Sequence, residues 1–188
     1  MNTRFDIKET SLSGLKRIIP FYREDNRGYF LKSFEKDVIR AFGLETDIYE
    51  EFESFSYKDV IRGMHFQTQN PQTKIVRALK GTIYDVVVDL RKDSSTFGQW
   101  QGFQLSEDNH ESLWIPAGFA HGFRVLSDSA ITSYKCMSKY LEVYDTGIKW
   151  NDPDIAIEWN ILNPVVSPRD DSLMAFQDFV NQYGALEI

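Results

Sequence analysis

The chain has 188 residues, of which 42% are hydrophobic and 14% aromatic, and its formal net charge is −7. This length and composition indicate one folded domain with a sizeable core, and they exclude a disordered chain. The acidic balance argues against broad nucleic-acid binding, which needs a basic field, but it allows an anionic small ligand in a locally basic pocket.

The first third of the chain predicts short strands separated by turns. A short helix is expected at Glu35–Phe42, with Gly43 as its C-terminal stop, and a turn at Glu24–Gly28. Alternating or apolar runs predict strands at Leu15–Pro20, Tyr29–Phe34, Asp47–Phe55 and Val60–Gln67.

The remainder continues in the same way until its end. Lys74–Leu79 and Thr82–Leu90, joined by Lys80-Gly81, predict a β-hairpin. Leu173, Phe176, Phe179 and Val180 have the spacing of an amphipathic helix over Asp171–Tyr183. A loop is expected at Asp145–Pro153, and further strands at Gly98–Leu105, Ser112–Ile115, His121–Leu126 and Ala130–Met137.

Many short strands with turns about every 8–12 residues are typical of an all-β sandwich or barrel. We therefore expect a double-sheet jelly roll with a short C-terminal helix, formed as a single domain by residues 1–188. Such a fold can hold a ligand in its mouth.

Three features predict a cytoplasmic protein without a membrane partner. Cys136 is the only cysteine, so no internal disulfide can form and a reducing compartment is indicated. The first ten residues contain no apolar signal core. No apolar run approaches the roughly 20 residues that a membrane span needs.

The segment Ile61–Gln67 is the first candidate for chemistry, because it places Arg62 and His65 inside an apolar strand. Strand alternation predicts that Arg62 shares one face with Met64 and Phe66, and that His65 lies on the other face with Ile61, Gly63 and Gln67. A strand that only fills a core rarely carries polar groups on both faces. A turn at Pro116 and Gly118 brings a second histidine, His121, into another apolar run.

Charged residues also interrupt the apolar strands, at Lys74, Asp85, Asp89 and Lys135. Any one of them is most simply a solvated outward residue. As a set with two histidines they suggest a site, and Lys74, Arg62 and His65 facing a barrel interior would need partners or a charged ligand.

A metal site is the main rival interpretation, but position 67 is Gln67 and no His-x-His pattern exists, so we expect no metal. Cys136 lies mid-strand, and neither a Gly-x-Ser-x-Gly nucleophile motif nor a dinucleotide or phosphate loop is present, so we expect no cofactor. General acid–base chemistry remains: a neutral His oriented by Asp can accept a proton, a Tyr can return one, and Lys or Arg can stabilise an oxyanion.

Taken together, the motifs resemble the dTDP-4-dehydrorhamnose 3,5-epimerase family between Arg27 and Asp170. The matching stretches are Arg62-Gly-Met-His65-Phe-Gln67, Lys74-Ile-Val-Arg77, Gly81-x-Ile-x-Asp85, Thr96-Phe-Gly-x-Trp100, Trp114-Ile-Pro-x-Gly-Phe-Ala-His121-Gly-Phe, Tyr134-Lys and Gly147-Ile-x-Trp150-Asn-Asp-Pro. The resemblance implies a metal-free, cupin-like jelly roll that acts as a homodimer and epimerises a nucleotide-linked 4-keto-6-deoxy sugar.

The resemblance also implies residue roles. His65 is the expected base, oriented by Asp170; Tyr134 is the expected acid, and Lys74 stabilises the enolate. His121 is a pocket contact that Asp85 could orient. Further substrate contacts are expected at Arg27, Arg62, Tyr140 and Arg169.

This chain departs from the family pattern at several expected contact positions. Lys32 and Asp145 each stand where the family has Glu, and Glu50, Glu51 and Phe52 stand where it has Gln-Asp-Asn. The departures at Lys32 and at Glu50, Glu51 and Phe52 fall in segments expected to touch the nucleotide, in part across the dimer. Because carboxylates accept hydrogen bonds from amino groups, one hypothesis is a base other than thymine, and tolerated variation is the other.

Three alternatives to a 3,5-epimerase remain open at this point. The first is an epimerase that inverts only C3 or C5, and the second is a 3,4-ketoisomerase. The third is a non-catalytic module that binds sugar nucleotides.

Overall fold

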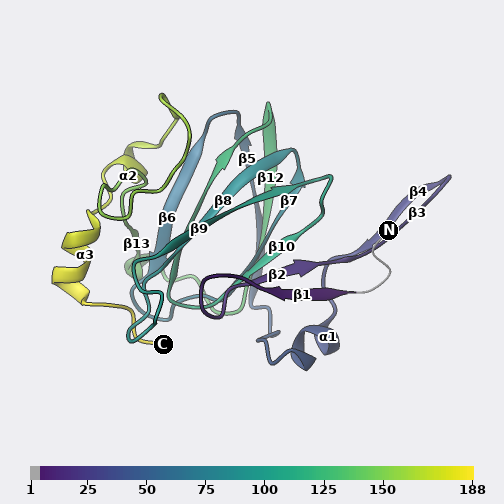
Figure 1. Ribbon diagram of the computed structural model, residues 1–188, viewed down its shortest axis with the longest axis horizontal. Coiled ribbons are helices and arrows are strands. Elements are labelled where there is room, and N and C mark those ends of the chain that lie inside the picture. The colour runs from purple at the N-terminus through teal and green to yellow at the C-terminus, as the bar shows by residue number, and fades with distance from the viewer. Residues whose placement is uncertain (1–4) are drawn as a thin grey trace.

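The computed structural model describes residues 5–188, so the first four residues of the predicted domain lie outside the described residues. Two antiparallel sheets face each other (Figure 1). The larger sheet has the order β1 (Asp6–Glu9), β2 (Lys16–Ile19), β10 (Ser112–Ile115), β7 (Lys74–Lys80), β12 (Ser129–Cys136) and β5 (Glu50–Tyr57). The smaller has the order β13 (Asp145–Gly147), β6 (Ile61–Gln67), β11 (Phe119–Val125), β8 (Thr82–Asp89) and β9 (Trp100–Ser106).

Three apolar clusters hold these layers together. The central cluster lies between the sheets and joins β7 and β12 to β8 and β11, with Val76, Val87 and Phe123 at 0–1% exposure. A second cluster covers the outer side of the smaller sheet with helix α3 (Phe176–Tyr183), and a third joins helix α1 (Lys36–Ala41) to the larger sheet. The predicted all-β double-sheet jelly roll is confirmed.

One hairpin projects from the body of the molecule (Figure 1). It consists of β3 (Phe21–Asp25) and β4 (Gly28–Lys32), which pair only with each other among the described residues. We call this hairpin the arm. The predicted turn at Glu24–Gly28 is its tip, but neither β3 nor β1 is predicted from the sequence. Both strands are short and carry several charges, so their apolar pattern is weak.

The predicted hairpin of β7 and β8 is wrong. Only Gly81 separates these strands, and β7 pairs with β10 and β12 while β8 pairs with β9 and β11. Gly81 is therefore the corner where the chain passes between sheets, and a Cβ there would lie 2.1 Å from the Ser129 carbonyl oxygen. The partners of both apolar strands come from distant segments, which a local turn signal cannot reveal.

The predicted C-terminal helix begins later than expected. Helix α2 (Pro168–Asp171) forms a separate turn, a bridge between Ile148 and Met174 follows, and α3 begins at Phe176. The Phe176 N–H donates to Asp152 Oδ2 at 2.8 Å. The carboxylate that satisfies the free N–H at the start of α3 therefore comes from a distant loop. That loop, predicted as 145–153, also contributes β13.

Strand β6 does not alternate as the sequence predicts. Its register with β11 pairs His65 with His121 and Arg62 with Phe123, so two residues of β6 lie opposite the single Gly122. This is a β-bulge, which shifts the side of the sheet on which later residues point. Arg62 and His65 consequently line the same cavity, and their predicted placement on opposite faces is wrong.

The bulge depends on Gly63. Its φ is +127°, and a Cβ there would lie 2.5 Å from Gly122 Cα and 2.9 Å from the His121 carbonyl oxygen. We expect Gly63→Ala to lower the free energy of unfolding, measured by urea denaturation, by more than ~2 kcal/mol, because backbone strain adds to a clash with backbone. Gly28→Ala is the control, since Gly28 has φ +115° with nothing within 4 Å. Equal losses in the two variants would contradict this explanation.

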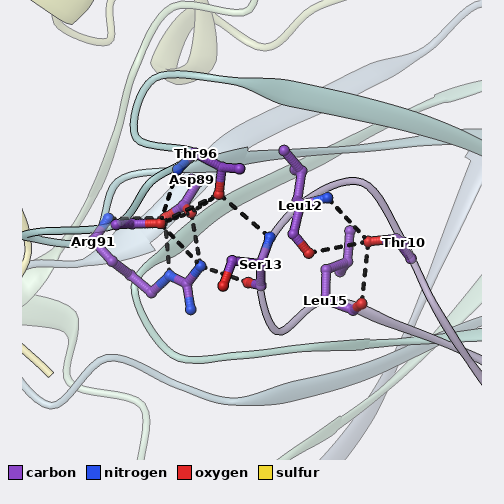
Figure 2. Close-up of polar contacts among 8 residues, drawn as sticks. Thr10, Leu12, Ser13, Leu15, Asp89, Arg91 and Thr96 are labelled. Carbon is purple, nitrogen blue, oxygen red and sulfur yellow. Dashed lines mark hydrogen bonds and ion pairs between the residues drawn. The ribbon is translucent and has the colours of Figure 1, made fainter.

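A buried carboxylate ties three segments together beside β8. Figure 2 shows Arg91 against Asp89, with Nε 2.9 Å from Oδ1 and Nη2 2.7 Å from Oδ2. Arg91 also donates to the Ser13 carbonyl, and the hydroxyls of Ser94 and Thr96 donate to Asp89 Oδ2. Burial acts to raise the pKa of Asp89, but these hydrogen bonds lower it overall. Asp89 therefore has a structural role in holding these segments together. It is buried, whereas the simplest expectation from the sequence was a solvated residue pointing outward.

None of the helices within residues 5–188 is long and apolar enough to cross a membrane.

Candidate active site

A cavity of about 240 Å³ opens at the mouth between the two sheets. Nine of the residues singled out from the sequence line it, and they come from both sheets. They are Phe52, Lys74 and Tyr134 from the larger sheet, Arg62, His65, His121 and Asp145 from the smaller sheet, and Tyr140 and Arg169 from the segments at the mouth.

His65 is held from behind by the carboxylate of Asp170. His65 Nε2 lies 2.8 Å from Asp170 Oδ1, and the Gly63 N–H donates to Oδ2 at 3.0 Å. Burial acts to raise the pKa of Asp170, but the hydrogen bond and charge of His65 and the Gly63 N–H lower it below its ordinary value. A carboxylate can only accept, so Nε2 carries the proton and Nδ1 is left as an acceptor.

Helix α2 positions Asp170 for this contact. Ser167 precedes the helix and its Oγ accepts from the Asp170 N–H at 3.1 Å, while Pro168 occupies the first helical position. Both are favoured at a helix start, because Ser caps a free N–H and Pro has none to satisfy. The local sequence thus sets the helix turn, and its contact with β6 decides where the carboxylate points.

The second histidine has its own carboxylate. His121 Nε2 lies 2.8 Å from Asp85 Oδ2, and both residues are buried, at 5% and 0% exposure. This contact agrees with the predicted orientation of His121 by Asp85. Burial raises the pKa of Asp85, and His121 opposes that shift in part.

Tyr134 faces the two histidines from the opposite sheet. Its side chain is 8% exposed, and its ring lies edge-on to His121 with centroids 5.8 Å apart. Burial raises the pKa of the Tyr134 phenol above its ordinary value. The hydroxyl group therefore remains protonated at neutral pH and can act as a donor.

Lys74 supplies a partly buried cation to the cavity lining. Burial lowers the pKa of its ammonium, and nearby acidic groups oppose that shift in part. Gln72 also lines the cavity, and its Nε2 donates to Glu50 Oε1 and to the Ser138 carbonyl, each at 2.8 Å. Glu50 thus reaches the site through Gln72.

The mouth of the cavity is organised by Asp145 and two arginines. Asp145 Oδ2 accepts from the Tyr140 hydroxyl at 3.0 Å and from Arg169 Nη2 at 2.5 Å. Arg62 Nε donates to Ser56 Oγ at 2.9 Å. Both arginines line the cavity, so an anionic ligand bound there would lie near two guanidinium groups.

Three predicted contact residues lie elsewhere in the chain. Arg27 sits at the tip of the arm and pairs with Asp25, and Lys32 pairs with Glu35. Glu51 pairs with Lys135 on the outer side of the larger sheet, because alternation along β5 turns it away from the cavity.

Six other residues of the cavity lining are not among the site residues predicted from the sequence. Ser54 follows Phe52 by two positions on the same strand face, and Gln67 follows His65 in the same way, so strand alternation could have indicated both. Gln72 belongs to a loop and gave no signal. The full set of missed lining residues is Ser54, Phe66, Gln67, Gln72, Gly122 and Phe123.

Within residues 5–188, no group of three or more His, Cys, Asp and Glu side chains is arranged to hold a metal ion. Each of the two cavity imidazoles instead contacts one buried carboxylate. The expectation of a metal-free and cofactor-free site stays a prediction.

The fold and the cavity define a class of protein. His65, whose Nδ1 can accept a proton, and Tyr134, whose hydroxyl can donate one, line one cavity from opposite sheets, together with Lys74. This is a ligand-binding jelly roll equipped to move protons on a small bound molecule.

Comparison with known proteins identifies the family. The sequence model described as dTDP-4-dehydrorhamnose 3,5-epimerase matches residues 9–178. The enzyme of that name from Methanothermobacter thermautotrophicus is 48% identical over 155 residues, which cover 82% of this chain and 84% of that protein. The chain belongs to the dTDP-4-dehydrorhamnose 3,5-epimerase family.

Solved structures agree with this assignment. A dTDP-6-deoxy-D-glucose-3,5-epimerase from Legionella pneumophila, in complex with dTDP-4-keto-L-rhamnose, matches with a TM-score of 0.93 and 37% identity, covering 98% of this chain and 99% of that one. A 4-keto-6-deoxy sugar epimerase from the novobiocin cluster of Streptomyces spheroides matches with a TM-score of 0.94 and 30% identity, covering 100% and 95%.

Proposed function

We propose that this chain is a cofactor-independent 3,5-epimerase of a nucleotide-linked 4-keto-6-deoxy sugar such as dTDP-4-dehydro-6-deoxyglucose. Membership of the family supports the reaction class and the substrate class. The observation that carries the proposal is the placement of the His65–Asp170 pair and Tyr134 on opposite sides of one cavity.

The proposed reaction is proton removal and return beside a ketone. The C4 carbonyl acidifies the hydrogens on C3 and C5, and His65 Nδ1 takes one of them, which leaves an enolate and an imidazolium. Asp170 stabilises the imidazolium, and the Lys74 ammonium, favoured by the negative ligand, stabilises the enolate oxygen. Tyr134 then donates its hydroxyl proton to the opposite face of the carbon. Proton exchange with solvent returns both side chains to their starting states.

Binding of the nucleotide is assigned to cations at the mouth and to a second copy of the chain. We assign Arg62 and Arg169 to the diphosphate, because both line the cavity and guanidinium groups pair well with phosphate oxygens. We assign Arg27 and Lys32 to the cavity of a homodimer partner, reached by the arm. The exposure of Tyr29 and Phe30, each 60%, supports an arm that is covered in an assembly. Light scattering should give the mass of a dimer, and a monomer would contradict this assignment.

The cellular location is assigned on redox grounds. We assign this reaction to the cytoplasm, because Cys136 is the only cysteine and no disulfide is available to the fold.

Solvent deuterium incorporation tests the reaction. Incubation of a 4-keto-6-deoxy sugar nucleotide with the protein in D2O should label both C3 and C5. Label at a single carbon would indicate a single-carbon epimerase instead. Absence of label would favour a non-catalytic binding module, and movement of the keto group to C3 would indicate a ketoisomerase.

We predict that dTDP is the nucleoside diphosphate that binds most tightly. The sequence hypothesis of another base relied on an acidic pair, but Glu51 is bound to Lys135 outside the cavity and Glu50 is engaged by Gln72. Calorimetric titration with dTDP, UDP, CDP and GDP checks this. Tighter binding of CDP or GDP would restore the hypothesis of a base other than thymine.

A further inference from the structure

One aromatic contact in the cavity is not explained by the proposed chemistry. Phe52 stands where the family pattern has Asn, and its ring stacks on that of Tyr134 with centroids 4.7 Å apart and an interplanar angle of 14°. The register of β5 and β12 places the two residues directly opposite each other. Facing cross-strand side chains interact strongly, so the backbone pairing itself sets this contact.

The Tyr134 ring is thereby confined on two sides. Phe52 covers one face, and His121 approaches with centroids 5.8 Å apart and an interplanar angle of 72°. Stacked and edge-on contacts of this kind are favourable for aromatic rings. The two neighbours together restrict rotation of the ring about its side-chain bonds.

Phe52 also separates Tyr134 from solvent. Strand β5 is the edge of the larger sheet, and Phe52 is 46% exposed while Tyr134 behind it is only 8% exposed. Removing the Phe52 ring would open one face of Tyr134 to water and leave space into which it could turn. The direction of the hydroxyl toward the bound sugar would then no longer be fixed.

We propose that Phe52 is a positioning residue that holds Tyr134 in the orientation needed to return a proton to the sugar. This inference rests on the proposed epimerase function and adds to it a residue that acts through Tyr134. Proton removal by His65 does not require Phe52, because His65 lies on the opposite sheet and is oriented there by Asp170 of helix α2. Phe52 should therefore affect the second half of the reaction and leave the first largely intact.

The test compares deuterium incorporation with net inversion in the same D2O reaction. In Phe52→Ala, incorporation should continue while inversion slows, raising the ratio of exchange to inversion by at least about fivefold. Phe52→Trp should restore the ratio, because it restores a flat ring. Phe55→Ala is the matched control, since Phe55 lies on the same strand at similar exposure, 49%, and contacts Tyr57 instead.

Two further measurements separate positioning from other roles. The dissociation constant for dTDP should stay within about twofold of wild type, as expected for a residue that acts after binding. In protein labelled with 13C at the tyrosine ring, the Tyr134 ring signals, assigned with Tyr134→Phe, should move downfield in Phe52→Ala as the stacked ring is lost. If Phe52→Ala does not fold, Phe52→Leu replaces it, because leucine keeps an apolar side chain without a ring.

The results for the Phe52 and Phe55 variants decide whether Phe52 positions Tyr134. An unchanged ratio in an active Phe52→Ala enzyme, or the same change in Phe55→Ala, would overturn the inference. Weaker dTDP binding with an unchanged ratio would make Phe52 a nucleotide contact and would also overturn it. If the wild-type protein neither incorporates deuterium into the sugar nor inverts its carbons, the proposed function is overturned. The role of Phe52 in reprotonation is then overturned as well.

Discussion

Replacing His65 with alanine should abolish deuterium incorporation at both C3 and C5 of a 4-keto-6-deoxy sugar nucleotide. The variant loses the imidazole that Asp170 orients, whose Nδ1 is left to accept a proton because Nε2 is bound to that carboxylate. Because a positioned general base contributes about 10²–10⁴ in rate, we expect a loss of about 10³-fold in kcat. Mass spectrometry of the sugar after incubation in D2O measures the exchange.

The control for this prediction is the third histidine. His110 lies outside the cavity, where its ring stacks on Tyr22 with centroids 4.6 Å apart. His110 has φ +58°, a conformation that asparagine tolerates, so His110→Asn should exchange at the wild-type rate. Circular dichroism should show that His65→Ala is folded. Exchange near the wild-type rate in a folded His65→Ala protein would reject His65 as the base.

Replacing Tyr134 with phenylalanine should separate the two halves of the reaction. Proton removal by His65 remains possible, so deuterium exchange should persist at least in part. Net inversion should slow by about 10²–10³-fold, because the proton donor on the far face of the ring is lost. The ratio of exchange to inversion, followed by NMR of the product sugar, measures this effect.

The control here is Tyr57→Phe, since Tyr57 is 70% exposed and lies outside the cavity lining. Its exchange and inversion should both match wild type. If Tyr134→Phe lowers exchange and inversion equally, Tyr134 positions the substrate and does not donate the proton. Together, the two variants test whether proton removal depends on His65 of the smaller sheet and proton return on Tyr134 of the larger sheet.

Much of the architecture was accessible from the sequence, because local patterns encode it. Apolar runs with a period of two predicted most of the strands. The helix predicted at Glu35–Phe42, with Gly43 as its stop, corresponds to α1. The family resemblance placed His65, Tyr134, Lys74 and Asp170 together. The structure brings the first three into one cavity and the fourth against His65.

Predictions failed where the deciding contact joins distant segments. The β7–β8 junction resembles a hairpin turn, but each strand finds its partners in a different sheet. Helix α3 begins where Asp152, from a remote loop, accepts from its first N–H group. Arg62 and His65 share one cavity because of a β-bulge opposite Gly122. The residues next to the bulge in the sequence give no signal that predicts it.

The sequence by itself determined most of the strands, the jelly-roll class and the residue types for acid–base chemistry, since side-chain periodicity and composition are local properties. The tertiary structure alone decided which side chains face the cavity and which are bound elsewhere, as with Glu51 on Lys135 and Phe52 on Tyr134. The physical reason is that register and sheet pairing are set by contacts between residues far apart in the chain, so one shifted position redirects every side chain that follows it.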